Sequence, residues 1–344
     1  MLKWLGLLLI IWFLYVVREV FPPFIIGGII AYLLFPLVKQ ISNSFSIKSH
    51  YSLAVIYFGL LTLFCVVFIV FGHSISEQFH ALFHQRKELI SNLLSQLSQT
   101  FQLQLDIDKT SDEVVTSFEE SFGRPEEIMH IGSLVSKGFL ATLVTVVSSI
   151  YFILDSQSVG KFFLRFIPEN RQDSVVKLIS QMNMMLSKYI RGQLLLILIM
   201  ASISYMFLHF VLHLKYALLI SILSGFFEII PVLGPILATS SATIVGIAQL
   251  GIPKAAWIIL FYTLARWMED YVVVPRVIGH AVELHPLAVI FAVLCGEVLA
   301  GGLGMLIAIP VAASVKLALD YFTTLESTET IDNKLTNSEN LETN

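Results

Sequence analysis

Residues 225–235 read Gly-Phe-Phe-Glu-Ile-Ile-Pro-Val-Leu-Gly-Pro, and this stretch decides how the chain must fold. Its acid, Glu228, is the single charge among the 38 residues between Lys215 and Lys254. An ionisable group at bilayer depth is costly unless it is paired or hydrated, and prolines interrupt the helix around it. Broken backbone at that depth is tolerated only where protein or a water-filled cavity satisfies it. The stretch therefore predicts a broken membrane helix that lines a solute path. The alternative is a kinked helix with a buried, protonated Glu228.

The composition is that of an integral membrane protein. Of the 344 residues, 56% are hydrophobic and 13% are charged, and the mean hydropathy is +0.81. Soluble domains carry about 25% charged residues, so an ordinary globular enzyme is excluded. The net charge of −4 and the lack of a basic patch predict no nucleic-acid partner. Two cysteines, both inside apolar runs, do not make a disulfide framework.

Apolar stretches long enough for membrane helices occur at 4–17, 20–38, 51–72, 131–154, 192–214 and 255–275. Two further regions, 216–250 and 286–319, are apolar but interrupted by glycine and proline. Residues 216–230 would form only about 22 Å of helix, which is less than the roughly 30 Å of a hydrocarbon core. We therefore expect an all-α polytopic membrane protein with about eight membrane segments, including two broken or re-entrant hairpins.

Two segments between these stretches have apolar residues at helical spacing among polar ones. They predict an amphipathic external segment over 73–130 and an amphipathic cytoplasmic segment over 155–191. The tail, 323–344, is rich in Thr, Asn and Glu and is expected to be disordered. The predicted organisation is thus N-terminal membrane helices (1–72), the external segment, a membrane helix (131–154), the cytoplasmic segment, a transport core (192–322) and the tail.

The distribution of Lys and Arg predicts the orientation in the membrane. Cytoplasmic loops are enriched in these residues, and segment 155–191 is the most basic connection of the chain. Counting spans back from it places 73–130 outside and the N-terminus in the cytoplasm. The basic residues of the segment are Lys161, Arg165, Arg171, Lys177, Lys188 and Arg191.

A second charged group follows in residues 266–279. Arg266 stands three and four residues before Glu269 and Asp270, so an intrahelical ion pair is available. Pro275 and Gly279 then interrupt the helix. The group is a candidate coupling site, and the alternative is a structural ion pair at a helix end.

A third group lies in the region 286–319, where Glu297 is the single charge between His285 and Lys316. This region has the plan of 216–250: an apolar segment, a glycine-flanked acid, a break and another apolar segment. A pair of interrupted hydrophobic segments is the best sequence pointer to a transporter's binding site, whereas the alternative is that the glycines serve close helix packing. The residues expected to break the helices and to gate the path are Gly225, Pro231, Gly234, Pro235, Pro275, Gly279, His285, Pro286, Gly301, Gly302, Gly304 and Pro310.

Signals for metals and enzymes are weak. Two histidine pairs, 80/84 and 209/213, have the i,i+4 spacing of metal ligands, but no third ligand accompanies either pair. The chain carries no motif of a membrane protease or of an ATP-driven pump. We expect no enzyme activity, no metal and no cofactor.

Several motifs occur together and in order along the chain. They are AYLLFP at 31–36, LD at 154–155, YIRGQ at 189–193, EIIPVLGP at 228–235, Glu269 followed by Pro275 and Gly279, LHP at 284–286, and Gly304 followed by Pro310. With these motifs the chain resembles the autoinducer-2 exporter family of bacterial inner-membrane proteins, over residues 5–320. Asp270 departs from the pattern, because an amide residue is more usual after the acid.

The resemblance implies a bacterial inner-membrane protein with about eight membrane segments, including re-entrant ones. It also implies homo-oligomers, for which a pentamer is expected, and export of a small solute. Some members of the family are linked to release of a quorum signal, and others to exchange of sodium or lithium for protons. Membership therefore leaves the substrate open.

Three functions are compatible with these residues. The leading hypothesis is a secondary transporter that exports a small polar solute, such as an autoinducer-2-like signal or a related metabolite, with coupling to protons. The second is a Na⁺(Li⁺)/H⁺ antiporter that uses the same acids. The third is a non-transporting membrane scaffold that binds partners through 73–130 and 155–190. The candidate transport and coupling residues are Glu228, Glu269, Asp270, Glu297 and Arg266.

Overall fold

The computed structural model describes residues 12–13, 16–104, 106–122, 131–230, 233–277 and 284–342. The regular elements within these ranges are all helical, which confirms the predicted all-α fold. The chain divides into two compact units. The first unit comprises residues 1–156 and 190–277, and the second comprises residues 157–189 and 278–344.

The first unit begins with three packed helices: α2 (Phe21–Phe45), α3 (Ser49–His84) and α7 (Ile131–Leu154). A short 3-10 turn, η1 (Arg18–Val20), leads into α2, which has proline in its first turn, where the missing N–H is no loss. The hydroxyl groups of Tyr57 and Ser149 meet between α3 and α7. The buried core of these helices is aliphatic and consists of Ala31, Leu34, Val38, Leu53, Ile56 and Ile153.

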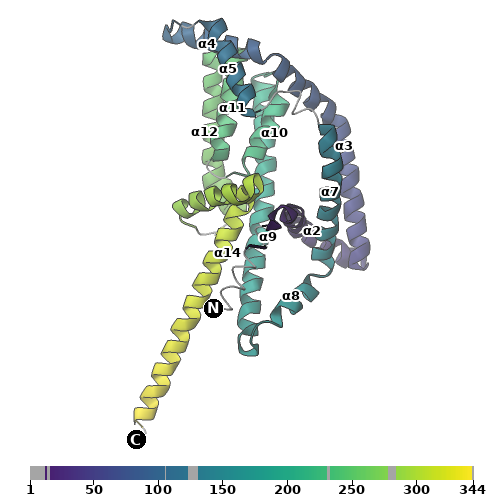
Figure 1. Ribbon diagram of the computed structural model, residues 1–344, viewed down its shortest axis with the longest axis vertical. Helices are drawn as coiled ribbons and strands as arrows, with labels where there is room; N and C mark the ends of the chain where they lie inside the picture. Colours follow the sequence, from purple (N-terminus) through teal and green to yellow (C-terminus); the bar gives the residue numbers. More distant parts are fainter. Residues whose placement is uncertain are drawn as a thin grey trace. The chain divides into compact units, whose positions relative to one another are not determined.

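The same unit contains a second group of helices, which holds the candidate site. Its members are α10 (Ala217–Phe227), α11 (Leu233–Leu250) and α12 (Ile252–Met268), which lie side by side (Figure 1). The end of α9 (Glu169–Tyr205) and the π-helical turn η2 (Met206–Val211) precede them. Helices α10 and α11 pack as a hairpin, whereas Gly251 makes the tight turn into α12 with a φ of 81°.

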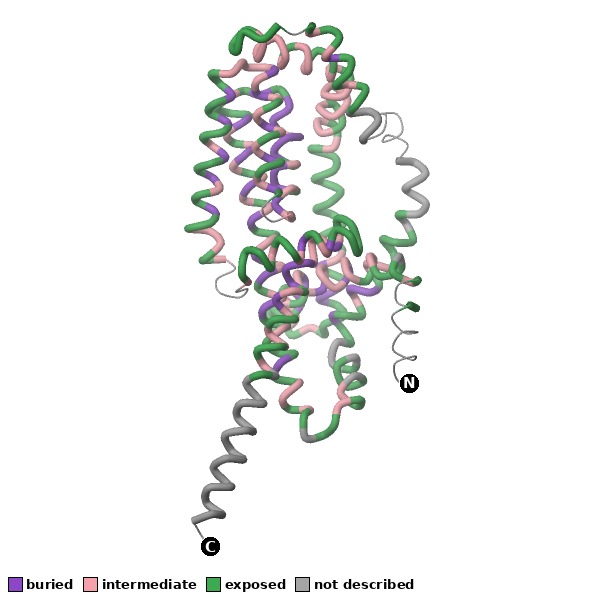
Figure 2. The backbone as a smooth tube through the Cα atoms, turned by 60° about the vertical axis from the view of Figure 1, so that its left-hand side comes forward, coloured by how far each residue is buried: buried purple, intermediate pink, exposed green. Residues whose placement is uncertain are grey.

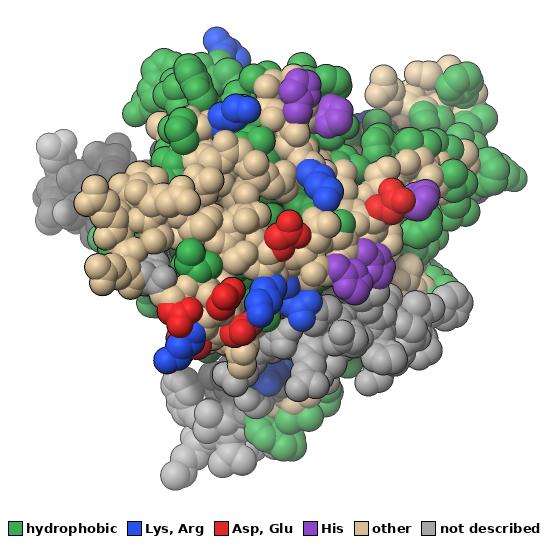
Figure 3. Space-filling model, turned by 90° about the horizontal axis from the view of Figure 1, so that it is seen from above, with side chains coloured by type: hydrophobic (Ala, Val, Ile, Leu, Met, Phe, Trp, Pro, Cys, Tyr) green, Lys and Arg blue, Asp and Glu red, His purple; other side chains and the backbone are tan. Residues whose placement is uncertain are grey.

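Two amphipathic helices, α4 (Arg86–Phe101) and α5 (Ile107–Phe122), pack together, and α4 contacts α11 at the loop end of α11 and α12. Seen from this end, the centre of the surface is polar and carries charged and histidine side chains, with hydrophobic side chains around it (Figure 3). Lys87 and Asp112 join the two helices through an ion pair with a separation of 2.6 Å between Nζ and Oδ1. The Asp112 carboxylate raises the pKa of Lys87.

Five helical stretches among the described residues are long and apolar enough to cross a membrane. Two shorter apolar helices, Leu140–Leu154 and Ala217–Phe227, accompany them. Residues 58–71 of α3 are exposed on every side, as a helix surrounded by lipid would be (Figure 2). The five stretches are Phe21–Phe45, Ser49–His84, Arg171–Val211, Leu233–Leu250 and Pro286–Tyr321.

The second unit contains α8 (Ser156–Leu164), the beginning of α9, and α14 (Pro286–Glu342). The side-chain amide of Gln172 donates to the carbonyl oxygens of Leu164 and Ile167, at 3.3 and 3.0 Å, and so fixes the turn between α8 and α9. Helix α14 reverses at Ala300 and Gly301, where non-helical backbone interrupts it. The arms on either side of this break form a hairpin, in which Gly296 packs against Gly304, whereas re-entry of residues 286–319 into the membrane stays a prediction.

Several predicted boundaries differ from the helices observed. The boundary at 72/73 lies inside α3, and the boundary at 191/192 lies inside α9, because leaving the membrane does not end a helix when its backbone hydrogen bonds continue. Residues 323–342, predicted to be disordered, are helical, since no proline or glycine interrupts α14 after Pro310. The predicted span 255–275 is α helix to Met268 and then changes to a π-helical turn. Most of span 4–17, residues 123–130, Pro231 and Gly279 lie outside the described residues.

Candidate transport site

The tip of the α10–α11 hairpin buries an acid against a base from α12. Glu228 directly follows α10, and its side chain is 5% exposed. The guanidinium of Arg266, in the last turn of α12, donates from Nη1 to Glu228 Oε1 at 3.1 Å. This pair joins residues 38 positions apart in the sequence, and it provides the partner that a buried carboxylate needs.

A π-helical turn brings two more acids to the same guanidinium. Directly after α12, residues Glu269–Val273 form the turn η3. Arg266 donates from Nη1 to Glu269 Oε2 at 3.4 Å. It also grips Asp270 with two contacts: Nε to Oδ2 at 2.9 Å and Nη2 to Oδ1 at 2.8 Å. The sequence predicted the intrahelical pair, and the structure adds Glu228 to it. We name Glu228, Arg266, Glu269 and Asp270 the carboxylate cluster.

The cluster holds more negative charge than its one base can neutralise. Three ionised carboxylates and one guanidinium sum to −2. The carboxyl groups of Glu228 and Glu269 accept from one and the same nitrogen, Arg266 Nη1, and Glu228 Oε2 is buried without a donor. Two carboxylates held this close to each other repel unless a proton or a cation is bound with them. The arrangement can therefore take up and release one positive charge.

The backbone at the hairpin tip is held by a residue that the sequence analysis did not select. The side-chain amide of Gln193, on α9, donates from Nε2 to the backbone carbonyl oxygen of Glu228 at 2.7 Å. This carbonyl stands at the end of α10, where helix carbonyls lack an intrahelical partner. The available signal was an amide at the start of a long apolar run, which needs a hydrogen-bond partner at that depth.

Two glycines allow the close approach of the segments at the tip. A Cβ at position 225 would lie 2.7 Å from the carbonyl oxygen of Ile197 on α9. At position 234 it would collide with the carbonyl oxygen of Phe227, across the hairpin turn. Gly225 lies inside α10 and Gly234 in the first turn of α11, so both serve the close packing of segments beside the break. Pro235 follows in the first turn of α11.

The other predicted residues lie elsewhere in the fold. Pro275 belongs to the short helix α13 (Val274–Val277), after η3. His285 precedes Pro286 at the start of α14, and its Nδ1 accepts a hydrogen bond from the backbone N–H of Leu287 at 3.2 Å.

In the second unit, Glu297 is exposed, and the hairpin break falls at Gly301, next to Gly302. Gly304 packs against Gly296 across that hairpin, and Pro310 lies inside the following arm.

The described ranges contain no group of three or more His, Cys, Asp or Glu side chains arranged to hold a metal ion.

Comparison with known proteins identifies the chain. The model of a family described as AI-2E family transporter matches residues 4–324. The chain belongs to this family. The AI-2E transporter family thereby accounts for nearly the whole sequence, including both interrupted regions and the carboxylate cluster.

Curated relatives of this AI-2E family protein are likewise named as transport proteins or permeases. YueF of Bacillus subtilis (strain 168), by name a candidate transport protein, is 27% identical over 318 residues, which cover 88% of this chain and 84% of YueF. YrrI of the same organism, with the same kind of name, is 24% identical over 323 residues, or 89% of this chain and 88% of YrrI. PerM of Escherichia coli (strain K12), by name a candidate permease, is 28% identical over 180 residues, or 52% of this chain and 50% of PerM. The AI-2E protein described here is a multi-pass membrane protein of a transporter family.

Proposed function

We propose that the protein is a secondary transporter that exports a small polar solute, such as an autoinducer-2-like signal or a related metabolite, across the bacterial inner membrane. Export is coupled to protons at the carboxylate cluster, and the protein has no enzyme activity. The N-terminus is cytoplasmic, and the chain works as a homo-oligomer, for which a pentamer is our expectation.

One observation carries this proposal: the carboxyl groups of Glu228 and Glu269 both accept from the same guanidinium nitrogen, Arg266 Nη1, at 3.1 and 3.4 Å. Adding one proton between them replaces the repulsion with a hydrogen bond and reduces the net negative charge of the cluster from −2 to −1. Losing that proton restores the repulsion, which favours a rearrangement of α12 relative to the α10–α11 hairpin. Proton binding is thereby linked to conformation, which is the requirement for coupled transport.

The carboxylate cluster lies between two helical segments whose relative position would change when the proton is lost. It joins the hairpin tip, which carries Glu228, to the junction of α12 and η3, which carries Arg266 and both other acids. Discontinuous helices that meet at a binding site are the usual construction of secondary transporters. Helix α10 has 11 residues and is about 16 Å long, which suits a hairpin that enters and leaves by one membrane face.

The direct test is efflux of autoinducer-2 from loaded proteoliposomes, with and without an imposed pH gradient. We expect the wild-type chain to release the solute faster with the gradient, and Glu228→Gln to lose this acceleration. A Glu228→Gln variant with normal rate and unchanged pH dependence would refute the coupling role. Oligomeric state is measured on the same detergent-solubilised sample by native mass spectrometry.

A Na⁺(Li⁺)/H⁺ antiporter is the alternative, because three carboxylates around one arginine can also hold a monovalent cation in place of the proton. In everted vesicles that contain a pH-sensitive dye, addition of Na⁺ or Li⁺ would then change the fluorescence in the wild type but not in Glu228→Gln. If neither assay responds and Glu228→Gln is without effect, whereas truncation of 73–130 removes the cellular phenotype, the non-transporting scaffold is the better description.

A further inference from the structure

Three hydroxyl groups meet one helical turn beyond the carboxylate cluster. Ser224 precedes Glu228 by four residues on α10, and Tyr262 precedes Arg266 by four residues on α12. Their oxygens are 2.6 Å apart. Ser204 of α9 places its hydroxyl beside that of Tyr262. All three side chains are buried, with exposed fractions of 0%, 3% and 0% for Ser224, Tyr262 and Ser204.

These hydroxyl groups have unused hydrogen-bonding capacity. Ser224 donates to the carbonyl oxygen of Ile220 at 2.8 Å, so the hydrogen bond between Ser224 and Tyr262 has the tyrosine as its donor. The Ser204 hydroxyl has no hydrogen bond of good geometry, although it is fully buried. A buried polar group without a partner is destabilising and is uncommon in native proteins, so it calls for an explanation. None of the three groups carries a charge at neutral pH, so together they suit an uncharged hydrogen-bonding group.

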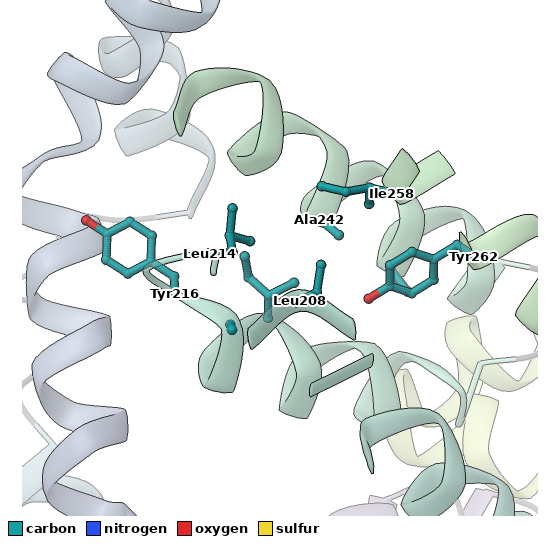
Figure 4. Close-up of a cluster of buried hydrophobic side chains, with 9 residues drawn as sticks. Leu208, Leu214, Tyr216, Ala242, Ile258 and Tyr262 are labelled. Carbon is teal, nitrogen blue, oxygen red and sulfur yellow. The ribbon is translucent and has the colours of Figure 1, made fainter. Parts of the chain in front are cut away.

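A layer of apolar side chains lies on the far side of the hydroxyl groups from the cluster. Four segments contribute to it: Leu208 from η2, Ile220 from α10, Ala242 from α11 and Ile258 from α12, none of them more than 2% exposed. Figure 4 shows Leu208, Ala242 and Ile258 between Tyr262 and Tyr216. We name these four residues the apolar layer. The four side chains are hydrocarbon and offer a solute no hydrogen-bonding group.

Polar groups resume beyond the apolar layer, at the end of the unit that carries α4. The Tyr216 hydroxyl points away from the layer (Figure 4) and donates to Gln85 Oε1 at 2.7 Å. The same oxygen accepts from Lys215 Nζ at 3.0 Å. Gln249 Oε1 accepts from the backbone N–H of Lys215 at 3.1 Å. The order along these helices is therefore cluster, hydroxyl groups, apolar layer and polar end.

We propose that Ser204, Ser224 and Tyr262 form a second polar binding station of the transport path, and that the apolar layer closes the path between this station and the polar end in the present conformation. The station takes hydroxyl groups of an uncharged solute, or water, that leave the carboxylate cluster. The identity of the cluster as the first station rests on the proposed function, whereas the route itself does not depend on which solute is carried.

The route is tested by the accessibility of an introduced cysteine. The background is the full chain with both native cysteines replaced (Cys65→Ser and Cys295→Ser), reconstituted in proteoliposomes. The probe is the small membrane-impermeant thiol reagent MTSET. A Lys215→Cys variant identifies the face of the liposome at which the polar end is exposed, because Lys215 is exposed there. Ser224→Cys then reports whether the reagent reaches the station from that face.

We expect Ser224→Cys to react slowly by itself, and about tenfold faster or more when Ile258→Ser is added, because a polar side chain opens the layer to water. Leu208→Ala serves as a second opening variant in case Ile258→Ser impairs folding, which is monitored by size-exclusion chromatography. The matched control is Ile56→Ser, the same substitution in the buried core of α2, α3 and α7, and it should leave the reaction rate of Ser224→Cys unchanged. An unchanged rate in both opening variants, with intact folding, overturns the proposal.

Failure of this proposal and failure of the coupling role are distinguishable. If Ile258→Ser exposes Ser224→Cys but Glu228→Gln transports normally, the route exists and the coupling residue is elsewhere. If Glu228→Gln abolishes pH-dependent transport but neither opening variant exposes Ser224→Cys, the coupling role holds and the station is wrong.

Discussion

The two hairpins of the molecule have the same sequence plan but different tips. In α10–α11, the acid Glu228 is buried and paired with Arg266. In the hairpin of α14, the acid Glu297 is exposed, and the tip is a backbone reversal at Gly301, which has a φ of 58°. The residues at 296 and 304 bring the two arms of that hairpin into direct backbone contact.

The comparison separates what makes a hairpin from what makes a site. Glycines and an apolar sequence are sufficient for the chain to reverse and for the arms to pack closely. A buried, chemically active acid also requires a base from another helix, because an unpaired buried charge is too costly. In the α10–α11 hairpin, α12 supplies this base as Arg266.

The largest effect is expected when that base is removed. Arg266→Ala leaves Glu228 buried without its partner. Breaking a fully buried pair costs about 3–5 kcal/mol, and we expect a smaller loss here because the Arg266 side chain is 36% exposed. We expect a lower unfolding temperature in detergent and loss of coupled efflux. Arg266→Lys keeps the charge but loses the bidentate contact with Asp270. Its unfolding temperature and coupled efflux should lie between those of Arg266→Ala and the wild type. If Arg266→Ala unfolds at the wild-type temperature, then the buried acid at the α10–α11 tip does not depend on Arg266.

The next largest effect separates the two acids. Glu228→Gln should reduce coupled efflux by about tenfold or more, as expected for a buried ionisable residue with a functional role. Glu297→Gln, a matched change in the other hairpin, should keep most of the activity because its side chain is exposed. Efflux rates of both variants, normalised to the protein reconstituted, decide the matter. Equal losses would mean that both tips take part in coupling.

A smaller, structural effect is expected from glycine replacement. Gly234→Ala forces a Cβ against the carbonyl oxygen of Phe227, and overpacking of this kind costs about 1–3 kcal/mol. Gly302→Ala introduces a methyl group into open space at the other tip and should not lower the unfolding temperature. Thermal unfolding followed by tryptophan fluorescence measures both. The reverse order of stability would contradict the observed packing.

Asp270→Asn tests the exposed edge of the cluster. The Asp270 side chain is 43% exposed, and ion pairs open to solvent contribute about 0–1 kcal/mol. We expect little change in stability and at most a severalfold change in efflux. A loss as large as that of Glu228→Gln would place the coupling proton on Asp270.

The smallest effect is expected at the polar end. Asp112 raises the pKa of Lys87, so this ion pair stabilises the folded state below the ordinary pKa of lysine, about 10.4, and the contribution is lost as pH rises through the higher folded value. The pair is exposed to solvent and therefore weak. Lys87→Met should leave the unfolding temperature unchanged at neutral pH. A clear drop would mean that α4 and α5 depend on this contact.

Much of the fold follows from hydropathy. Spans 20–38, 51–72 and 131–154 coincide with α2, the first part of α3, and α7, because long apolar runs leave the backbone no alternative to helix. Helix ends are less predictable, since α3 and α9 continue past the apolar runs without a residue that stops them. Disorder of the tail was also predicted wrongly for residues 323–342, because their polar composition disfavours burial but does not prevent a helix.

The site was predictable only in part. The pairing of Arg266 with Asp270 and Glu269 is local and follows from spacing along one helix. The ion pair between Glu228 and Arg266, the hydrogen bond from Gln193, and the meeting of Ser224 with Tyr262 each join different helices. Such contacts depend on the packing and the relative heights of the helices, which a single sequence does not encode in any local pattern.

Helix α12 also carries two exposed tryptophan side chains at different heights along its axis. Trp257 and Trp267 are 60% and 61% exposed, one beside the apolar layer and the other beside Arg266. Ten residues of helix separate them by about 15 Å along the axis. With Trp4→Phe and Trp12→Phe in place, quenching of each indole by lipids brominated at successive carbon positions would report its depth in the bilayer. The native chromophores thus turn the position of a buried charge in the membrane into a fluorescence measurement.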